Sequence, residues 1–123
     1  MLEALAVALG GALGSLGRWQ LGVLFKQWIP NLPVGTFAAN VVAGLIIGFV
    51  TGMDLASPLQ QQVKLFLAVG LCGGLSTFST FSNETLVFIQ AGNWTAAGAN
   101  IAANVITCLV TVFIGLKVAA AVA

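Results

Sequence analysis

The stretch that decides the fold is GGLSTFSTFSNE, residues 73–84, which lies in the middle of an otherwise apolar chain. Two adjacent glycines precede five hydroxyl side chains, and two phenylalanines stand between the hydroxyls. A lipid bilayer offers no partners for loose polar groups, so the protein itself must satisfy such a run inside a membrane segment. We expect the rest of the chain to hold this stretch at mid-membrane, where its backbone and rings can meet ions.

The composition is typical of a membrane protein. Of the 123 residues, 59% are hydrophobic and 6% are charged, and the mean hydropathy is +1.08. A soluble domain carries about 25% charged residues. At roughly 20 apolar residues per span, the length allows about four spans. The sequence therefore predicts an all-α integral membrane protein, a single four-helix transmembrane domain over residues 1–123, inserted in a lipid bilayer.

The charged residues exclude several classes of function. The net charge is +1, which argues against nucleic acid as a partner. There is no histidine, and the three acids, Glu3, Asp54 and Glu84, lie far apart in the sequence. Zinc-type sites and histidine-based catalysis lack their ligands and bases. We do not expect an enzyme.

The third of four expected helices should be broken. Adjacent glycines lower helix propensity, and a hydroxyl run offers the freed backbone alternative partners. Carbonyls released at a break can bind a small cation. The alternative is an unbroken helix that uses its glycines for packing. The helices are expected at about residues 2–25, 34–53, 58–90 with a break at 73–77, and 94–118.

Three polar residues inside the spans each have a structural and a functional interpretation. Arg18 is either a snorkelling end charge or a cation that attracts anions into a vestibule. Asn40, with Thr36 one turn earlier, either bonds a neighbouring helix or donates to an anion. Glu84 is either an end charge or a pathway group. The last helix has a polar face that either packs on protein or lines a pore: Asn100, Asn104, Thr107, Cys108 and Thr111.

The basic residues show no bias in orientation. Four spans place Lys64 and Lys117 on one side of the membrane and Arg18 and Lys26 on the other. We therefore predict insertion in both orientations and an antiparallel homodimer. Glycines three or four residues apart offer close-packing surfaces for that contact, and they form two stripes: Gly10, Gly14 and Gly17, then Gly44, Gly48 and Gly52.

Residues 73–82 resemble the Fluc (CrcB) family of microbial fluoride channels, and the likeness extends over essentially the whole chain. It includes GTFAAN at residues 35–40 and the Arg18–Trp19 pair. The resemblance implies a dual-topology homodimer with two antiparallel fluoride pores. It also implies a central structural Na⁺ at the dimer axis, held by the backbone carbonyls of Gly73 and Ser76 from both subunits.

The resemblance assigns the fluoride pathway as well. Phe78 and Phe81 match the paired phenylalanines of the pores, and Asn40 matches the pore asparagine. Arg18 and Glu84 match vestibule and pathway positions. Where the family builds a hydroxyl track on the last helix, this chain has Asn100, Asn104 and Cys108. Donors to a strongly hydrated anion are also available from hydroxyl and amide groups, so the expected pathway further includes Thr36, Ser79, Thr80 and Asn104.

The expected function is passive export of fluoride across a bacterial inner membrane by a multi-pass channel. HF crosses membranes and dissociates inside, and an inside-negative potential drives the anion out by about 2.3 kcal/mol per 100 mV. The first alternative is a small dual-topology proton-coupled multidrug exporter, which needs a buried acid in the first helix, whereas Glu3 lies near its end. The second is a non-transporting membrane assembly subunit, which leaves the polar run of residues 76–82 unexplained.

Overall fold

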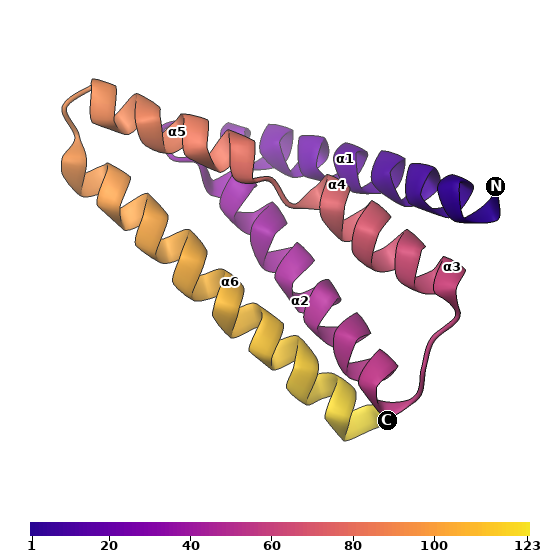
Figure 1. Cartoon of the computed structure of the whole chain (residues 1–123). Helices are drawn as coiled ribbons and strands as arrows, with labels where there is room; N and C mark the ends of the chain where they lie inside the picture. The colour runs from indigo at the N-terminus through magenta and orange to yellow at the C-terminus, as the bar shows by residue number, and fades with distance from the viewer.

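The computed structural model describes residues 1–123, and its regular secondary structure is all helical, with no strands. A short extended segment, Ser76 and Thr77, separates the two halves of the third helical stretch. The interruption lies within the predicted range of 73–77. The elements in chain order (Figure 1) are α1 (Leu2–Trp28), α2 (Val34–Ala56), α3 (Gln61–Lys64), η1 (Leu65–Cys72), α4 (Gly73–Leu75), α5 (Phe78–Gln90) and α6 (Trp94–Val122).

Three stretches of helix are long and apolar enough to cross a membrane. They are α2, the composite Gln61–Gln90 and α6. Although α1 has 27 residues, it is not among them, because its glycines and polar residues such as Arg18 and Gln20 lower its hydropathy. The all-α membrane architecture is confirmed with three candidate spans, and a fourth span through α1 remains a prediction.

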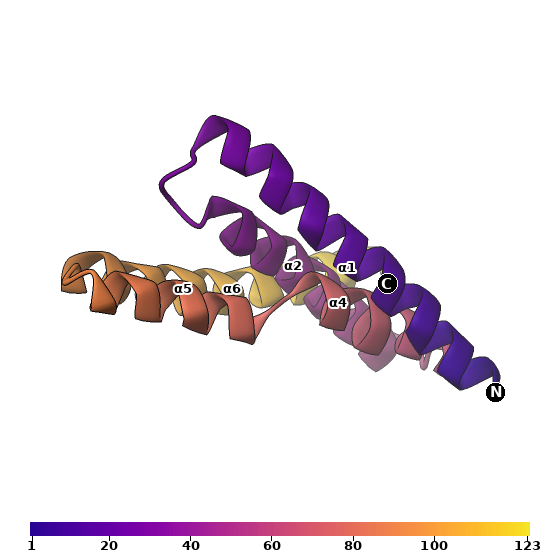
Figure 2. The ribbon, with the colours of Figure 1, turned by 90° about the horizontal axis from the view of Figure 1, so that it is seen from above.

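The helices pack in two pairs whose members run in the same direction. In the first pair, Gly10 of α1 faces Gly70, and Gly14 lies further along against Leu75. In the second pair, Gly44 of α2 faces Thr111 and Gly52 faces Ala119 of α6. Figure 1 shows α2 and α6 side by side, and Figure 2 shows the α5–α6 hairpin extending away from α1.

The glycine stripes serve packing within the chain. A Cβ on Gly14 would lie 2.8 Å from the Leu75 nitrogen, and one on Gly48 would lie 2.9 Å from the Val112 carbonyl carbon. The expectation that these stripes form the contact between two copies is therefore wrong, because neighbouring helices of the same chain already cover them. Large apolar residues remain exposed elsewhere, as expected for surfaces that face lipid, and examples are Leu86, Leu109 and Phe113.

The core is small and lies where α2 meets the third helical stretch. Its buried members are Ala39 and Ala43 of α2, Cys72 of η1 and Leu75 of α4. The Cys72 thiol donates to the Ala43 carbonyl at 3.7 Å. Small side chains in this core let the backbones of α2 and η1 approach closely just before the helix break.

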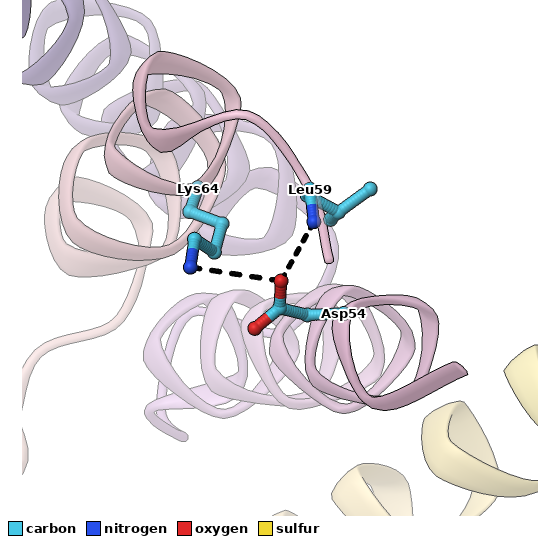
Figure 3. Close-up of polar contacts among 3 residues, drawn as sticks. All are labelled: Asp54, Leu59 and Lys64. Atoms are coloured by element: carbon cyan, nitrogen blue, oxygen red, sulfur yellow. Dashed lines mark hydrogen bonds and ion pairs between the residues drawn. The ribbon is translucent and has the colours of Figure 1, made fainter. Parts of the chain in front are cut away.

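The third helical stretch begins at Gln61, three residues later than the predicted start. Gln60 is extended, with ψ at 144°. The Leu59 amide donates to Asp54 Oδ1 at 2.8 Å, and Lys64 Nζ lies 3.6 Å from the same oxygen (Figure 3). Asp54 thus holds the turn between α2 and α3 in a conformation that keeps residues 57–60 out of the helix.

The η1 segment is a π-helix of 8 residues, whereas the sequence pattern predicts an α-helix here. Such wide turns are rare and often occur at functional sites. η1 runs directly into α4 and hence into the break. At the far end, Gly92 has φ of 78°, a conformation that favours glycine, and Asn93 Oδ1 caps α6 by accepting from the Ala96 amide at 3.0 Å.

Candidate functional site

The helix break is held open by an asparagine from another helix. In a continuous helix the Thr77 amide donates to the Gly73 carbonyl. Here Thr77 is extended, and its amide donates to Oδ1 of Asn40 in α2 at 3.0 Å. Asn40 therefore replaces the missing helical acceptor inside an apolar span, where an unpaired amide is costly.

Hydroxyl side chains also bond to backbone groups beside the break, as the sequence predicts. The Thr80 amide donates to Thr77 Oγ1 at 3.2 Å, which caps the start of α5. Ser76 Oγ donates to the Cys72 carbonyl at 2.7 Å. Thr77 Oγ1 also lies 3.2 Å from Thr80 Oγ1 and 3.3 Å from Ser79 Oγ, so three hydroxyls cluster at the first turn of α5.

The Gly73 and Ser76 carbonyls are among those that lose their usual helical donors at this break. The Gly73 carbonyl loses the Thr77 amide, which goes to Asn40. The Ser76 carbonyl loses the Thr80 amide, which goes to Thr77 Oγ1. These are the two carbonyls that the resemblance implies as cation ligands. A main-chain oxygen without a helical partner is the donor type that hard cations such as Na⁺ prefer, so the local structure fits such a ligand set.

Asn40 also belongs to a buried polar cluster with α6 and α5. Its Nδ2 donates to Asn104 Oδ1 at 3.2 Å. Asn104 Nδ2 donates to the Asn100 carbonyl at 2.9 Å and to Asn100 Oδ1 at 3.1 Å. Asn100 Nδ2 in turn donates to Thr85 Oγ1 at 2.9 Å. The predicted polar face of the last helix thus packs on protein at Asn100 and Asn104.

A hollow of about 560 Å³ opens beside the break, between the end of α1, the start of α2 and α5. Two cations, Arg18 and Lys26, line it together with one acid, Glu84, so its balance of charge is positive. Its polar wall also includes Thr36 and Thr80. An electropositive concave surface raises the local concentration of anions.

Two long-range bonds hold the residues of this hollow in place, and one of them reaches the break. Arg18 Nε donates to the Gly74 carbonyl at 3.1 Å, which joins the cation to the glycine pair. Thr36 Oγ1 donates to Glu84 Oε2 at 3.0 Å, which joins α2 to α5. Glu84 Oε1 is buried and has no hydrogen-bond partner in the protein, so this carboxylate retains the capacity to accept a further bond.

The two phenylalanines lie close together but in different environments. Their ring centroids are 5.5 Å apart with an interplanar angle of 54°. Phe81 is buried at 8% exposure, whereas Phe78 is 78% exposed on the surface of the single chain. Any pore that both rings line must therefore include a surface outside this chain.

The structure brings the predicted residues together in three groups: Arg18, Thr36, Thr80 and Glu84 at the hollow, Asn40 with Asn104, and the two phenylalanines. Ser79 joins Thr80 through the hydroxyl cluster. Sequence reasoning missed Thr85 and the pairing of the Thr77 amide. A threonine preceding an amphipathic turn signals an N-cap, but no local pattern reveals a partner 37 residues away.

Comparison with known proteins identifies the family of this arrangement. Residues 5–116 match the family model described as "CrcB-like protein, Camphor Resistance (CrcB)". The chain belongs to the CrcB family. The match includes all of the elements that form the break, the polar cluster and the hollow.

Curated relatives of this CrcB protein carry a more specific name, "Fluoride-specific ion channel FluC". One, from Pectobacterium carotovorum, is 48% identical over 101 residues, which are 81% of this chain and 80% of the relative. One from Paraburkholderia phymatum is 43% identical over 122 residues, 98% of this chain and 97% of the relative. One from Escherichia coli O1:K1 is 44% identical over 117 residues, 94% and 93% of the two chains.

Proposed function

We propose that this CrcB protein is a fluoride-selective channel that exports F⁻ passively from the cytoplasm and so relieves fluoride toxicity. The relatives' names supply the ion. The observation that carries the proposal is the exchange at the break, where Asn40 takes the Thr77 amide in the middle of an apolar helical stretch. That exchange places amide and hydroxyl donors at membrane depth, and a small, strongly hydrated anion needs such donors.

The proposed path starts at the hollow. Arg18 and Lys26 attract the anion, and Thr36, Thr80 and Glu84 line its way toward the break. From there the hydroxyls of Ser79 and Thr80 and the amides of Asn40 and Asn104 lie near the path. Phe78 and Phe81 offer positive ring edges, which favour an anion.

The complete pore is proposed to need a second copy in the opposite orientation. The exposed Phe78 ring supports this, because a ring that is 78% exposed can line a pore only with a further surface across from it. The charges agree, since Arg18 and Lys26 lie toward one end of the bundle and Lys64 and Lys117 toward the other. An antiparallel dimer of this kind has two pores, with α1 as the fourth span of each subunit in a bacterial inner membrane.

A central Na⁺ at the dimer axis is also proposed, held by the Gly73 and Ser76 carbonyls of both copies. Support comes from the displacement of the Thr77 and Thr80 amides, which leaves these oxygens without their helical donors. A bound monovalent cation supplies positive charge that offsets repulsion between the carbonyls. The chain's own contribution is to keep the break open through Asn40 and the Thr77 hydroxyl.

The test is fluoride efflux from liposomes that contain the purified protein, followed with a fluoride-selective electrode. We expect rapid efflux that needs no pH gradient, and chloride efflux that stays at the level of empty liposomes. Extrusion of a cationic dye that depends on a proton gradient would support a multidrug exporter instead. Absence of both transport activities would support an assembly subunit and refute the channel.

A further inference from the structure

The polar cluster is a single chain of hydrogen bonds in which every donor points the same way. It begins at the backbone N–H of Thr77, which donates to Asn40 Oδ1. Asn40 Nδ2 then donates to Asn104 Oδ1, and Asn104 Nδ2 donates to Asn100 Oδ1. Three helical segments, α5, α2 and α6, are thereby joined at the level of the break.

This chain of hydrogen bonds begins at the N-cap of α5 and also ends in α5. Asn100 Nδ2 donates to Thr85 Oγ1, and the Thr85 hydroxyl donates to the Phe81 carbonyl at 2.9 Å. The first end is a backbone N–H, which can only donate, and the last is a backbone C=O, which can only accept. Rotating any one side-chain amide by 180° would set two donors or two acceptors face to face. The two backbone ends therefore fix the orientation of every amide between them.

Asn104 has no amide hydrogen left for an ion. Its Nδ2 has two acceptors, the Asn100 carbonyl and Asn100 Oδ1, and its side chain is buried at 5% exposure. Asn40 differs, because its Nδ2 carries two hydrogens and donates to one acceptor, Asn104 Oδ1. A spare N–H therefore remains on the residue that holds the break open.

We propose that Asn104, Asn100 and Thr85 are positioning residues that act on fluoride only through Asn40. The one-way chain holds the Asn40 amide in a single orientation and keeps its second N–H available to an anion. This inference rests on the proposed function and assigns Asn104 a role behind the pathway instead of in contact with the ion. Because both ends of the chain lie on the first turns of α5, it also fixes the turn that carries the phenylalanine pair.

Thr85→Val tests the proposal, since valine keeps the shape of threonine and removes the hydroxyl that ends the chain. Thr111→Val is the matched control. Thr85 and Thr111 are buried to 7% and 6% exposure, and each donates to a carbonyl of its own helix. The Thr111 bond to the Cys108 carbonyl does not belong to the chain. Thr85→Ser restores a hydroxyl and serves as the rescue variant.

Two measurements are made on the full-length protein. Fluoride efflux from liposomes should fall roughly tenfold in Thr85→Val and stay near wild type in Thr85→Ser and Thr111→Val. In lipid bicelles, the NMR signal of the Thr77 amide proton should move upfield in Thr85→Val, because each bond in a chain polarises the next. It should not move in Thr111→Val. If Thr85→Val does not fold, Asn100→Ala interrupts the same chain and carries the same expectations.

If the Thr77 amide signal is unchanged in folded Thr85→Val, the proposed chain of hydrogen bonds is refuted. A shifted signal with normal flux would overturn its role in positioning, as would an equal loss of flux in Thr111→Val. The NMR measurement does not depend on transport. If the wild-type protein carries no fluoride, the proposed function fails and the link to the anion fails with it, whereas the Thr77 signal still tests the hydrogen-bond chain itself.

Discussion

The α2–α6 contact and the segment around Ser76 and Thr77 solve the same problem, close approach of polypeptide in a membrane, by opposite means. Along α2 and α6, glycines bring two continuous helices together so that a Cβ on Gly48 or Gly115 would meet backbone atoms. At the break, side chains substitute for backbone partners, and Asn40 replaces the Gly73 carbonyl as an acceptor. The glycine contact uses up its space, whereas the break leaves carbonyls and an amide N–H free. The comparison shows that the groups able to bind an ion lie where the backbone is not helical, and not where the helices pack most closely.

The largest effect is expected at a glycine contact. Gly14→Ala places a methyl group against the Leu71 carbonyl and 2.8 Å from the Leu75 nitrogen, both of them backbone atoms that cannot move aside cheaply. We expect a loss of about 1–3 kcal/mol in the free energy of unfolding, seen as a lower melting temperature in detergent. Gly98→Ala is the control, because a Cβ there meets no atom within 4 Å. It should stabilise α6 slightly, and equal melting of the two variants would contradict the packing account.

At the break, the corresponding change is Asn40→Leu. It removes the acceptor of the Thr77 amide and the donor to Asn104 together. Each buried bond lost costs about tenfold in an equilibrium, so fluoride efflux should fall roughly a hundredfold. Thr51→Val, at an exposed position of the same helix, should leave efflux unchanged. Normal efflux in Asn40→Leu would show that the glycine contacts alone hold the pathway.

The two phenylalanines that follow the break, buried Phe81 and exposed Phe78, test whether aromatic rings take part in conduction. Phe81→Ile and Phe78→Ile keep apolar volume and remove the positive ring edge. We expect each to lower fluoride flux roughly tenfold without dissociating the oligomer, measured by electrode recording and size-exclusion chromatography. If neither variant alters the flux, the rings play no part in conduction.

A smaller effect is expected at the hollow. Arg18→Gln removes a cation that lines it and weakens the bond to the Gly74 carbonyl. Flux should fall about threefold at low ionic strength and less at high ionic strength, since salt screens the lost attraction. Lys117→Gln provides the comparison, because Lys117 lies away from the hollow, 5.3 Å from the centre of the Phe113 ring. A drop of the same size in both variants would argue against local attraction.

The smallest effect is expected at the turn between α2 and α3, which lies outside both the α2–α6 contact and the helix break. Asp54→Asn keeps an oxygen for the Leu59 amide and removes the ion pair with Lys64. Because both side chains are about a third exposed, water and salt screen the pair, and the loss should be about 0–1 kcal/mol. Thermal melts of this variant and the wild type should nearly coincide, and a large drop would mean that the turn contributes more to folding than its exposure suggests.

Local sequence pattern was enough to predict the helical segments and the site of the break, but not their bounds: α3 begins three residues later than predicted, and α1, α2 and α6 end three or four residues later. Adjacent glycines and the hydroxyl run from Ser76 indicate it directly, and four-residue spacing places Asn100 and Asn104 on one face. Pairing across the bundle could not be predicted in this way. Nothing near Thr77 indicates that its amide bonds to Asn40, and nothing near Asp54 indicates that it delays the start of α3.

Two further outcomes depend on geometry that composition does not encode. The π-helix at η1 has the apolar sequence of an ordinary α-helix, and its Gly70 lies against Gly10 of α1. The exposure of Phe78 depends on which way α5 leaves the break. Both follow from how helices are placed in space, which the periodicity of one segment does not determine.

The oxygens of Gly73 and Ser76 belong to the main chain, so no codon change can delete them. A screen for inactive mutants can therefore recover the residues that expose these oxygens, such as Asn40 and Thr77, but never the oxygens themselves. Genetic saturation of residues 73–76 would report on backbone shape and not on ligand identity. Only a change to the peptide bond itself, such as amide-to-ester replacement by chemical synthesis, can address these atoms one at a time.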